Sequence, residues 1–174
     1  MLDFSNSKIL IVGDVMLDKY YFGKVDRISP EAPVPIVNIQ KEESRLGGAS
    51  NVANNIVSLG GHSLLCGVIG HDLFGKEIER ISRHKNIDTF LLKTSSPTIT
   101  KARIIGGKQQ IVRVDYEDKS ELNADNKKLF RDTISRILPE YDILVISDYG
   151  KGLISEDLCR YLIKLAHKYD KKVI

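Results

Sequence analysis

The chain has 174 residues, of which 42% are hydrophobic and 28% are charged, and its formal net charge is +3. This composition is typical of one globular domain with its own core, and so small and evenly spread a charge argues against a nucleic-acid partner. The sequence has no apolar run of about 18 residues and no signal-like N-terminus, so we expect no membrane partner and a cytoplasmic location. Cys66 and Cys159 lie in apolar patterns that predict buried thiols, and the four histidines lack metal-ligand spacing, so no metal site is predicted.

The first predicted element is a buried parallel strand over residues 8–12, KILIV, which ends at Gly13. A strand of this kind delivers the side chains that follow it to a site at the carboxyl edge of the sheet. Asp14 and Asp18 are therefore candidate ligands, although each taken alone is as easily a turn or helix cap. Only one glycine follows the strand, so the glycine fingerprint of nicotinamide-binding enzymes is absent.

Residues 20–40 interrupt any helical pattern with prolines at 30, 33 and 35 and then give a β-rich run over residues 34–39. Proline cannot donate a ladder hydrogen bond and is confined to edge strands. This segment therefore predicts a small sheet that projects from the main body.

The segment from Gly47 to Gly70 predicts a ligand cradle. Gly47 and Gly48 allow a tight bend and a close approach to a ligand, and a short helix follows, ended by Gly60-Gly61 before a strand over residues 63–69. Amide groups at a helix start bind anions or hydroxyl oxygens, and the Asn51 amide both donates and accepts, which suits a polyol. Considered alone, the same residues are more simply a turn and a helix cap.

Residues 72–82 predict a helix with Asp72 as its cap, and residues 88–92 predict a further strand. The apolar residues expected to face inward from this helix are Leu73, Ile78 and Ile81. Gly70-His-Asp-Leu-Phe-Gly-Lys76 mimics a phosphate-binding P-loop, but Glu77 stands where a serine or threonine should bind magnesium. A true P-loop is therefore not expected.

Residues 98–117 predict a β-hairpin, with Gly106-Gly107 as a two-residue turn. That turn pairs Lys101 with Val112, Arg103 with Gln110 and Thr100 with Arg113, and it places Lys101, Arg103 and Gln110 on one face with Arg113 on the other. Two neighbouring cations suit a sugar that carries a phosphate. The alternative is a solvated hairpin with solubilising charges.

The last third of the chain alternates helix and strand: a helix over residues 123–138, a strand over 142–146, a helix over 153–169 and the start of a strand over 171–174. Leu129 is among the residues expected to face inward. The strand over 142–146 delivers Asp148 and Lys151 to the same edge as Asp14, where they are a substrate-side loop or only a surface ion pair. This alternation predicts a mostly parallel sheet with helices on both faces.

Several of these motifs resemble one family. The spacing of Gly47, Asn51, Ala53, Gly60 and Gly70 resembles the first signature of the PfkB (ribokinase-like) carbohydrate kinases. RISPEAPVP at residues 27–35 and TKxR at residues 100–103 resemble the heptose-7-phosphate kinase branch. The resemblance implies a ribokinase-like α/β fold over residues 1–174 with a β lid made of residues of about 20–40 and 98–117.

The resemblance also implies roles for individual residues. Asp14, Asp18 and Asn51 would hold sugar hydroxyls, Gly47 and Gly48 would let the sugar approach the backbone, Lys101 and Arg103 would bind the sugar phosphate, and Asp148 and Lys151 would line a substrate loop. The implied reaction transfers the ATP γ-phosphoryl group to the anomeric hydroxyl of heptose 7-phosphate, with Mg²⁺, in ADP-heptose and lipopolysaccharide biosynthesis. The lid implies a homodimer.

The GAGD motif that carries the base in this family does not occur in the sequence, so the base is expected beyond Ile174 and the C-terminal part of the fold is expected to be missing. We therefore expect the chain alone to be inactive. The alternatives are a non-catalytic sugar-phosphate-binding fragment, half of a split kinase that needs a complementary C-terminal half, and a PfkB kinase for another sugar.

Overall fold

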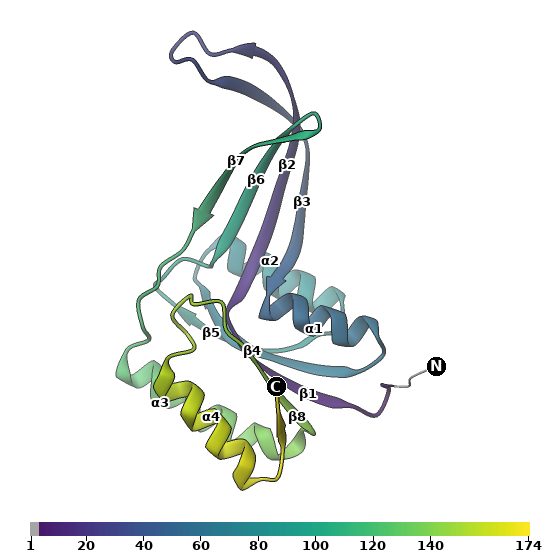
Figure 1. The fold of residues 1–174 in the computed structure, drawn as a ribbon, viewed down its shortest axis with the longest axis vertical. Coiled ribbons are helices and arrows are strands. Elements are labelled where there is room, and N and C mark those ends of the chain that lie inside the picture. Colours follow the sequence, from purple (N-terminus) through teal and green to yellow (C-terminus); the bar gives the residue numbers. More distant parts are fainter. Residues whose placement is uncertain (1–3) are drawn as a thin grey trace.

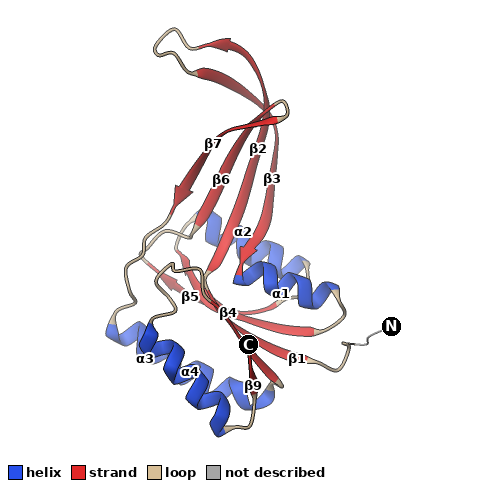
Figure 2. Ribbon diagram, viewed as in Figure 1, coloured by secondary structure: helices blue, strands red, loops and turns tan. Residues whose placement is uncertain are grey.

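Two β-sheets organise the chain and lie in different parts of the molecule (Figures 1 and 2). The computed structural model describes residues 4–174. The body is built on a five-stranded sheet whose members are β1 (Lys8–Gly13), β4 (His62–Gly70), β5 (Asp88–Thr94), β8 (Ile143–Ser147) and β9 (Lys172–Val173). They lie in the order β5-β4-β1-β8-β9, and every pair is parallel.

Helices cover both faces of this sheet, as the alternating pattern predicts (Figure 1). One face is covered by α1 (Ala49–Ser58) and α2 (Leu73–His84), and the other by α3 (Ala124–Ile137) and α4 (Glu156–Lys168). A short 3₁₀ helix, Leu138–Glu140, follows α3. None of the helices formed by residues 4–174 is long and apolar enough to cross a bilayer.

The central position of β1 in the body sheet explains why residues 9–12 are all apolar, whereas Lys8 at its start is exposed. Ile11 packs into the cluster under α1 and α2, whereas Leu10 and Val12 pack into the cluster under α3 and α4. All three side chains are fully buried. A strand covered on both faces has no polar side, so its residues do not alternate.

The second sheet projects from the body (Figure 1). It consists of β2 (Val15–Ile28), β3 (Pro35–Gly48), β6 (Thr100–Gly106) and β7 (Gln109–Tyr116), in the order β3-β2-β6-β7. The strand that begins at Pro35 lies at an edge, as its prolines predict. Strand β2 begins much earlier than expected, so Asp18 lies within a strand rather than in a loop after β1.

The predicted register of the β6–β7 hairpin is wrong. Gly106 pairs with Gln109, so the turn is formed by Gly107 and Lys108, and Gly107 has the positive φ of 64°. A bulge between Ile104 and Ile105 shifts the register further. The resulting pairs are Lys101 with Asp115 and Arg103 with Arg113. Because directly paired residues share a face, Arg113 lies on the same face as Arg103, not on the opposite one.

The capping residue of α2 was predicted more accurately than the helix side chains that face the core. The Asp72 side chain caps α2 by accepting the Gly75 N–H, as predicted, and Asn123 and Ser155 cap α3 and α4. Two leucines predicted to face inward are exposed: Leu73 is 78% exposed at the first residue of α2, and Leu129 is 48% exposed.

Candidate functional site

The diglycine bend lies at the exit of β1. The Ala49 N–H donates to the Asp14 carbonyl at 2.9 Å, which joins the start of α1 to the end of β1. Gly48 has φ +55°, and a Cβ there would lie 2.4 Å from the Asp14 carbonyl oxygen. A Cβ on Gly47 would lie 2.5 Å from an Asp18 carboxylate oxygen. Gly48 therefore requires glycine for its backbone angle and for its close approach to the Asp14 carbonyl, whereas a Cβ on Gly47 would displace the Asp18 carboxylate.

Asp14 is only 1% exposed, and its carboxylate holds the loop after β8. Its Oδ2 accepts the N–H groups of Tyr149 at 2.8 Å and Lys151 at 3.1 Å. Its Oδ1 is buried and has no hydrogen-bond partner among residues 4–174. Burial raises the pKa of Asp14, with a smaller contribution from the Asp148 charge, and it outweighs the backbone N–H groups of Tyr149, Lys151 and Leu153, which lower it. Asp14 is thus neither a turn residue nor a helix cap.

Asp18, Lys101 and Arg103 come together on one face of the projecting sheet. Asp18 on β2 is directly paired with Lys101 on β6, and the Arg103 Nη1 donates to Asp18 Oδ1 at 2.6 Å. The Asp18 and Arg103 side chains are 23% and 22% exposed. Lys101 forms no ion pair with any carboxylate in the described part of the chain, and its Nζ lies 6.0 Å from the centre of the Tyr149 ring. Its amine is therefore free to meet an anionic ligand.

Two further residues on this face, Arg45 and Tyr20, were not predicted from the sequence. The guanidinium carbon of Arg45 lies 4.9 Å from the centre of the Tyr20 ring, and that of Arg103 lies 5.2 Å from it. Arg45, Tyr20, Asp18 and Asn51 line one pocket of about 520 Å³. The two-residue period of a strand could have predicted both residues. Once Asp18 is placed in β2, Tyr20 lies on the same face as Asp18, and Arg45 on β3 is directly paired with Asp18.

Asn51 is the third residue of α1, is exposed, and lines this pocket. The N-cap of α1 is Gly48, so the alternative that Asn51 caps the helix is wrong. The Ser50 hydroxyl donates instead to the Gly47 carbonyl at 2.6 Å. The Asn51 amide therefore has no structural task at the helix start.

The loop of residues 148–152 does not contain the surface ion pair considered from the sequence. Asp148 accepts the Gly150 N–H at 2.8 Å, and Lys151 forms its ion pair with Glu117. The Lys151 side chain is 15% exposed and that of Glu117 is 25% exposed. This contact fastens the loop to the segment that follows β7, beside the free Lys101.

Comparisons with known proteins identify the family of the chain. The family model for pfkB family carbohydrate kinases matches residues 6–174. The chain belongs to the pfkB family of carbohydrate kinases. It is 45% identical over 157 residues to the bifunctional protein HldE of Nitratiruptor sp., covering 90% of this chain and 34% of that protein. It is 46% identical over 151 residues to the D-beta-D-heptose 7-phosphate kinase of Bordetella bronchiseptica, covering 86% of this chain and 48% of that protein.

The fold of this pfkB kinase chain is also that of solved family members. A putative phosphofructokinase from Staphylococcus aureus superposes with a TM-score of 0.77 at 15% identity, over 95% of this chain and 51% of that protein. The predicted ribokinase-like α/β fold is therefore confirmed. The chain spans about a third of the bifunctional relative and about half of the solved kinase.

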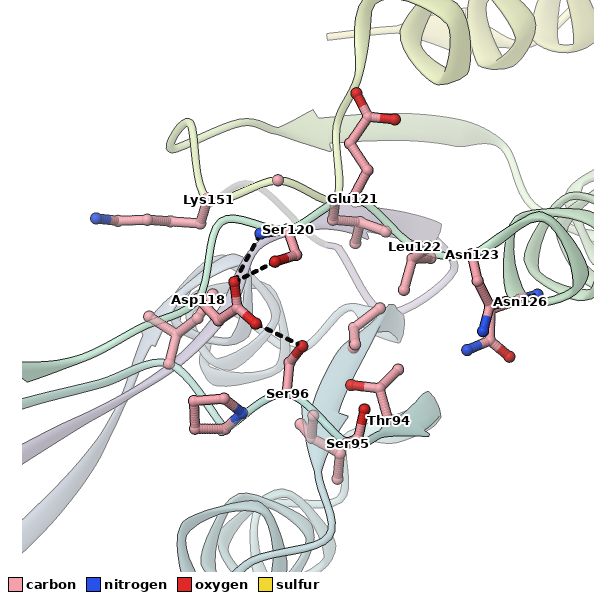
Figure 3. A pocket seen from close by; sticks show the side chains of 16 residues that line it. Thr94, Ser95, Ser96, Asp118, Ser120, Glu121, Leu122, Asn123, Asn126 and Lys151 are labelled. Carbon is pink, nitrogen blue, oxygen red and sulfur yellow. Dashed lines mark hydrogen bonds between the residues drawn. The ribbon is translucent and has the colours of Figure 1, made fainter.

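A second pocket lies behind the loop that carries Lys151 in this pfkB chain (Figure 3). Its volume is about 320 Å³, and it opens between the ends of β4 and β5 and the segment before α3. Asp118 lines this pocket and accepts hydrogen bonds from the hydroxyls of Ser96 and Ser120. Of the nine residues predicted for the site, only Lys151 lines it, and the Lys151 amine points away from the Asp118 cluster (Figure 3).

The P-loop alternative is excluded by the same structure. The Asp72 carboxylate accepts the N–H and the hydroxyl of Thr98, both at 2.7 Å, as well as the Gly75 N–H at 2.8 Å. A carboxylate therefore occupies the place where a P-loop holds phosphate. Within residues 4–174, no group of three or more His, Cys, Asp or Glu side chains could hold a metal ion.

Proposed function

We propose that this chain forms the sugar-phosphate side of a cytoplasmic kinase. The reaction transfers the γ-phosphoryl group of ATP to the anomeric hydroxyl of D-glycero-D-manno-heptose 7-phosphate, in ADP-heptose and lipopolysaccharide-core biosynthesis. The observation that carries the proposal is the free Lys101 beside Arg103 and Asp18, because a phosphorylated sugar needs cations and hydroxyl acceptors side by side. The choice of sugar is supported by the name of the Bordetella bronchiseptica relative, a D-beta-D-heptose 7-phosphate kinase.

Sugar hydroxyls would be held around the diglycine bend. Asp18 would accept hydrogen bonds from sugar hydroxyls, and the Asn51 amide would donate and accept. Asp14 Oδ1, which has no partner among residues 4–174, would be a further acceptor. Gly47 and Gly48 keep this space open, since any side chain there would meet Asp18 or the Asp14 carbonyl. A buried carboxylate oxygen without a donor is costly, and a ligand hydroxyl would remove that cost.

The sugar phosphate would be bound by Lys101 and Arg103, which share a face of β6. Asp18 fixes the Arg103 guanidinium at 2.6 Å and so orients its remaining donors before the ligand arrives. Asp148 and Lys151 would close the site from the body side. Lys151 is held by Glu117, so we assign it to the position of the loop rather than to the phosphate.

These residues position a substrate and do not complete the transfer. In-line phosphoryl transfer needs a base and an oxyanion site, and magnesium, when bound, would offset phosphate charge. The sequence has no GAGD motif to supply the base. We therefore expect the pure chain to show no ATP-dependent turnover; steady phosphorylation of heptose 7-phosphate by it would contradict this.

A second candidate is supported by the coverage of the solved kinase, about half of whose length matches this chain. On this reading, the chain is a non-catalytic sugar-phosphate-binding module or one half of a split kinase that needs a complementary C-terminal chain. Adding a separately expressed C-terminal half that carries GAGD distinguishes the two: a split kinase gains turnover, and a binding module does not.

Calorimetry tests the proposed sugar. We expect heptose 7-phosphate to bind more tightly than fructose 6-phosphate, and Lys101→Ala and Arg103→Ala each to weaken binding about ten- to hundredfold, as for loss of a charged hydrogen bond. Equal affinity for both sugars would favour a kinase for another sugar. Unchanged affinity in both variants would mean that the phosphate is bound elsewhere.

We also propose that the projecting sheet pairs with a second copy of the chain. The face opposite Asp18 carries exposed apolar side chains, among them Val25, Ile39, Val112 and Val114, which are 38–45% exposed. An apolar patch on a twisted sheet is typical of a protein interface. Light scattering should show a dimer, and a Val112→Asp, Val114→Asp variant should be monomeric; a wild-type monomer would contradict the proposal.

A further inference from the structure

Arg45 on β3 has no role in the site as proposed so far, although it stands over the same aromatic ring as Arg103. We propose that Arg45 is a second arginine that contacts the phosphate of the sugar phosphate, and that the Tyr20 ring positions both arginines. This inference rests on the proposed function, because it adds a residue to the same phosphate-binding set.

The register of the projecting sheet places Arg45 beside the site. Asp18 is directly paired with Arg45 on one neighbouring strand and with Lys101 on the other. Directly paired residues share a face with their Cβ atoms about 4.5–5.5 Å apart. Asp18 is therefore flanked by a cation on each side, and the Arg103 guanidinium reaches it as well. Arg45 also lines the pocket that holds Asp18 and Asn51.

Tyr20 restricts where the two guanidinium groups can lie. Each stands within about 6 Å of the ring centre, the range in which the ring attracts a cation. The Phe22 ring is stacked along the strand at 6.1 Å and 10° from the Tyr20 plane. Arginine stacks flat on an aromatic face and still presents its edge donors. Tyr20 thus fixes two planar donor groups on one face while leaving their N–H edges available.

The present partner of Arg45 can release it. Arg45 Nη2 lies 2.7 Å from Glu43, but Lys41 Nζ lies 2.6 Å from the other Glu43 oxygen. If Arg45 turns to a phosphate, Glu43 keeps a cation and no carboxylate is left unpaired. The Arg45 side chain is 62% exposed, and an exposed ion pair contributes little stability. Moving Arg45 from Glu43 to a phosphate would therefore cost little free energy.

Arg113 offers a contrast on the same face. It donates to both oxygens of Asp115 through Nε and Nη2, at 2.8 and 2.9 Å. Asp115 has no second cation within ion-pair distance in the described part of the chain. Releasing Arg113 would leave Asp115 unpaired beside an incoming anion. The geometry therefore selects Arg45, and not Arg113, as the additional phosphate contact.

The test is calorimetric titration of the full chain with heptose 7-phosphate and with the unphosphorylated heptose. Arg45→Ala should weaken binding of the phosphate ester about ten- to hundredfold and leave binding of the free sugar unchanged. Arg45→Lys should recover part of the affinity, because it keeps the charge and loses the planar donors. The matched control is Arg80→Ala, which removes an exposed arginine paired with Glu77 on α2 and should change neither affinity.

Tyr20 variants test the positioning role. Tyr20→Phe keeps the ring and should bind the phosphate ester like the wild type, whereas Tyr20→Leu should weaken it while Arg45→Ala in the Tyr20→Leu background adds little further loss. Equal losses for the free sugar and the phosphate ester would show a merely structural role and overturn the inference.

The inference and the proposed function fail in different ways. If Lys101→Ala and Arg103→Ala weaken binding but Arg45→Ala behaves like Arg80→Ala, the inference alone is wrong. If the wild-type chain binds no sugar phosphate, the proposed function is wrong and the inference falls with it.

Discussion

The body sheet and the projecting sheet of this molecule are built by different rules. In the body, β1 is covered on both faces, and Leu10, Ile11 and Val12 pack into the core. In the projecting sheet, one face carries Asp18, Arg45, Lys101 and Arg103, and the opposite face carries exposed valines and Ile39. The body sheet is stabilised by buried apolar side chains, whereas the charged face of the projecting sheet is organised by pairs of individual charged side chains.

This difference separates stability from ligand binding. Replacing a buried residue of the body should remove buried area and destabilise the fold, because interiors are close-packed. Replacing a charged residue on the projecting sheet should leave the fold intact and change what it binds, because exposed ion pairs contribute little stability. The junction of the sheets, at Asp14 and the diglycine bend, should show both effects.

The largest expected effect is in the body. Phe130 is fully buried against Phe90, with their ring centres 5.9 Å apart. Phe130→Ala should lower the free energy of unfolding by about 3–5 kcal/mol, measured by urea denaturation. Its neighbour Leu129, which is 48% exposed, is the control, and Leu129→Ala should cost less than about 0.5 kcal/mol. Similar costs for the two variants would contradict the division drawn above.

An intermediate effect is expected at the junction. Gly48 and Gly60 both have positive φ, but a Cβ on Gly48 would meet the Asp14 carbonyl, whereas a Cβ on Gly60 would meet nothing within 4 Å. Gly60→Ala should cost about 1 kcal/mol of stability from its backbone angle alone. Gly48→Ala should cost more, about 1–3 kcal/mol, and should also weaken sugar binding.

Thermal unfolding and calorimetry of these two variants give the answer together. If Gly48→Ala resembles Gly60→Ala in both measurements, close packing at the bend has no functional consequence.

The body was predictable because apolar periodicity reports burial directly. The strands at residues 8–12 and 63–69 and the cap at Asp72 are found as expected. The inward prediction for Leu73 and Leu129 fails because a helical period does not say how wide the covered stripe is.

The projecting sheet was predictable only in outline. Its register depends on which glycine takes the positive φ and on a bulge at Ile104, and neither leaves a pattern in the sequence. Arg45 and Tyr20 were missed for the same reason, since their meeting with Arg103 depends on pairing between strands far apart in the chain. Proximity of Lys101 and Arg103 was predictable because they are two residues apart in one strand.

The smallest expected effect is the pH dependence of stability, which should differ in sign between the carboxylates of Asp72 and Asp14. Burial raises the pKa of Asp72, but the Thr98 and Gly75 donors lower it by more, so its pKa lies below the usual value; burial instead leaves the pKa of Asp14 above it. Stability from Asp72 is present above its unfolded pKa of about 4 and lost as the pH falls through its folded value. Asp14 has the opposite sign, since the folded state binds its proton more tightly.

Unfolding free energies of Asp72→Asn and Asp14→Asn, measured from pH 7 downward, separate the two signs. Relative to its asparagine variant, the wild type should lose stability in acid at Asp72 and gain it at Asp14. The same sign at both positions would contradict the assigned causes.

The most direct test of the central claim is a crystal structure of the chain with heptose 7-phosphate. The account predicts the phosphate within hydrogen-bonding distance of Lys101 and Arg103, and sugar hydroxyls on Asp18 and Asn51 above the diglycine bend. A sugar phosphate bound in the pocket beside Ser96 and Asp118, with the charged face of the projecting sheet left empty, would contradict it.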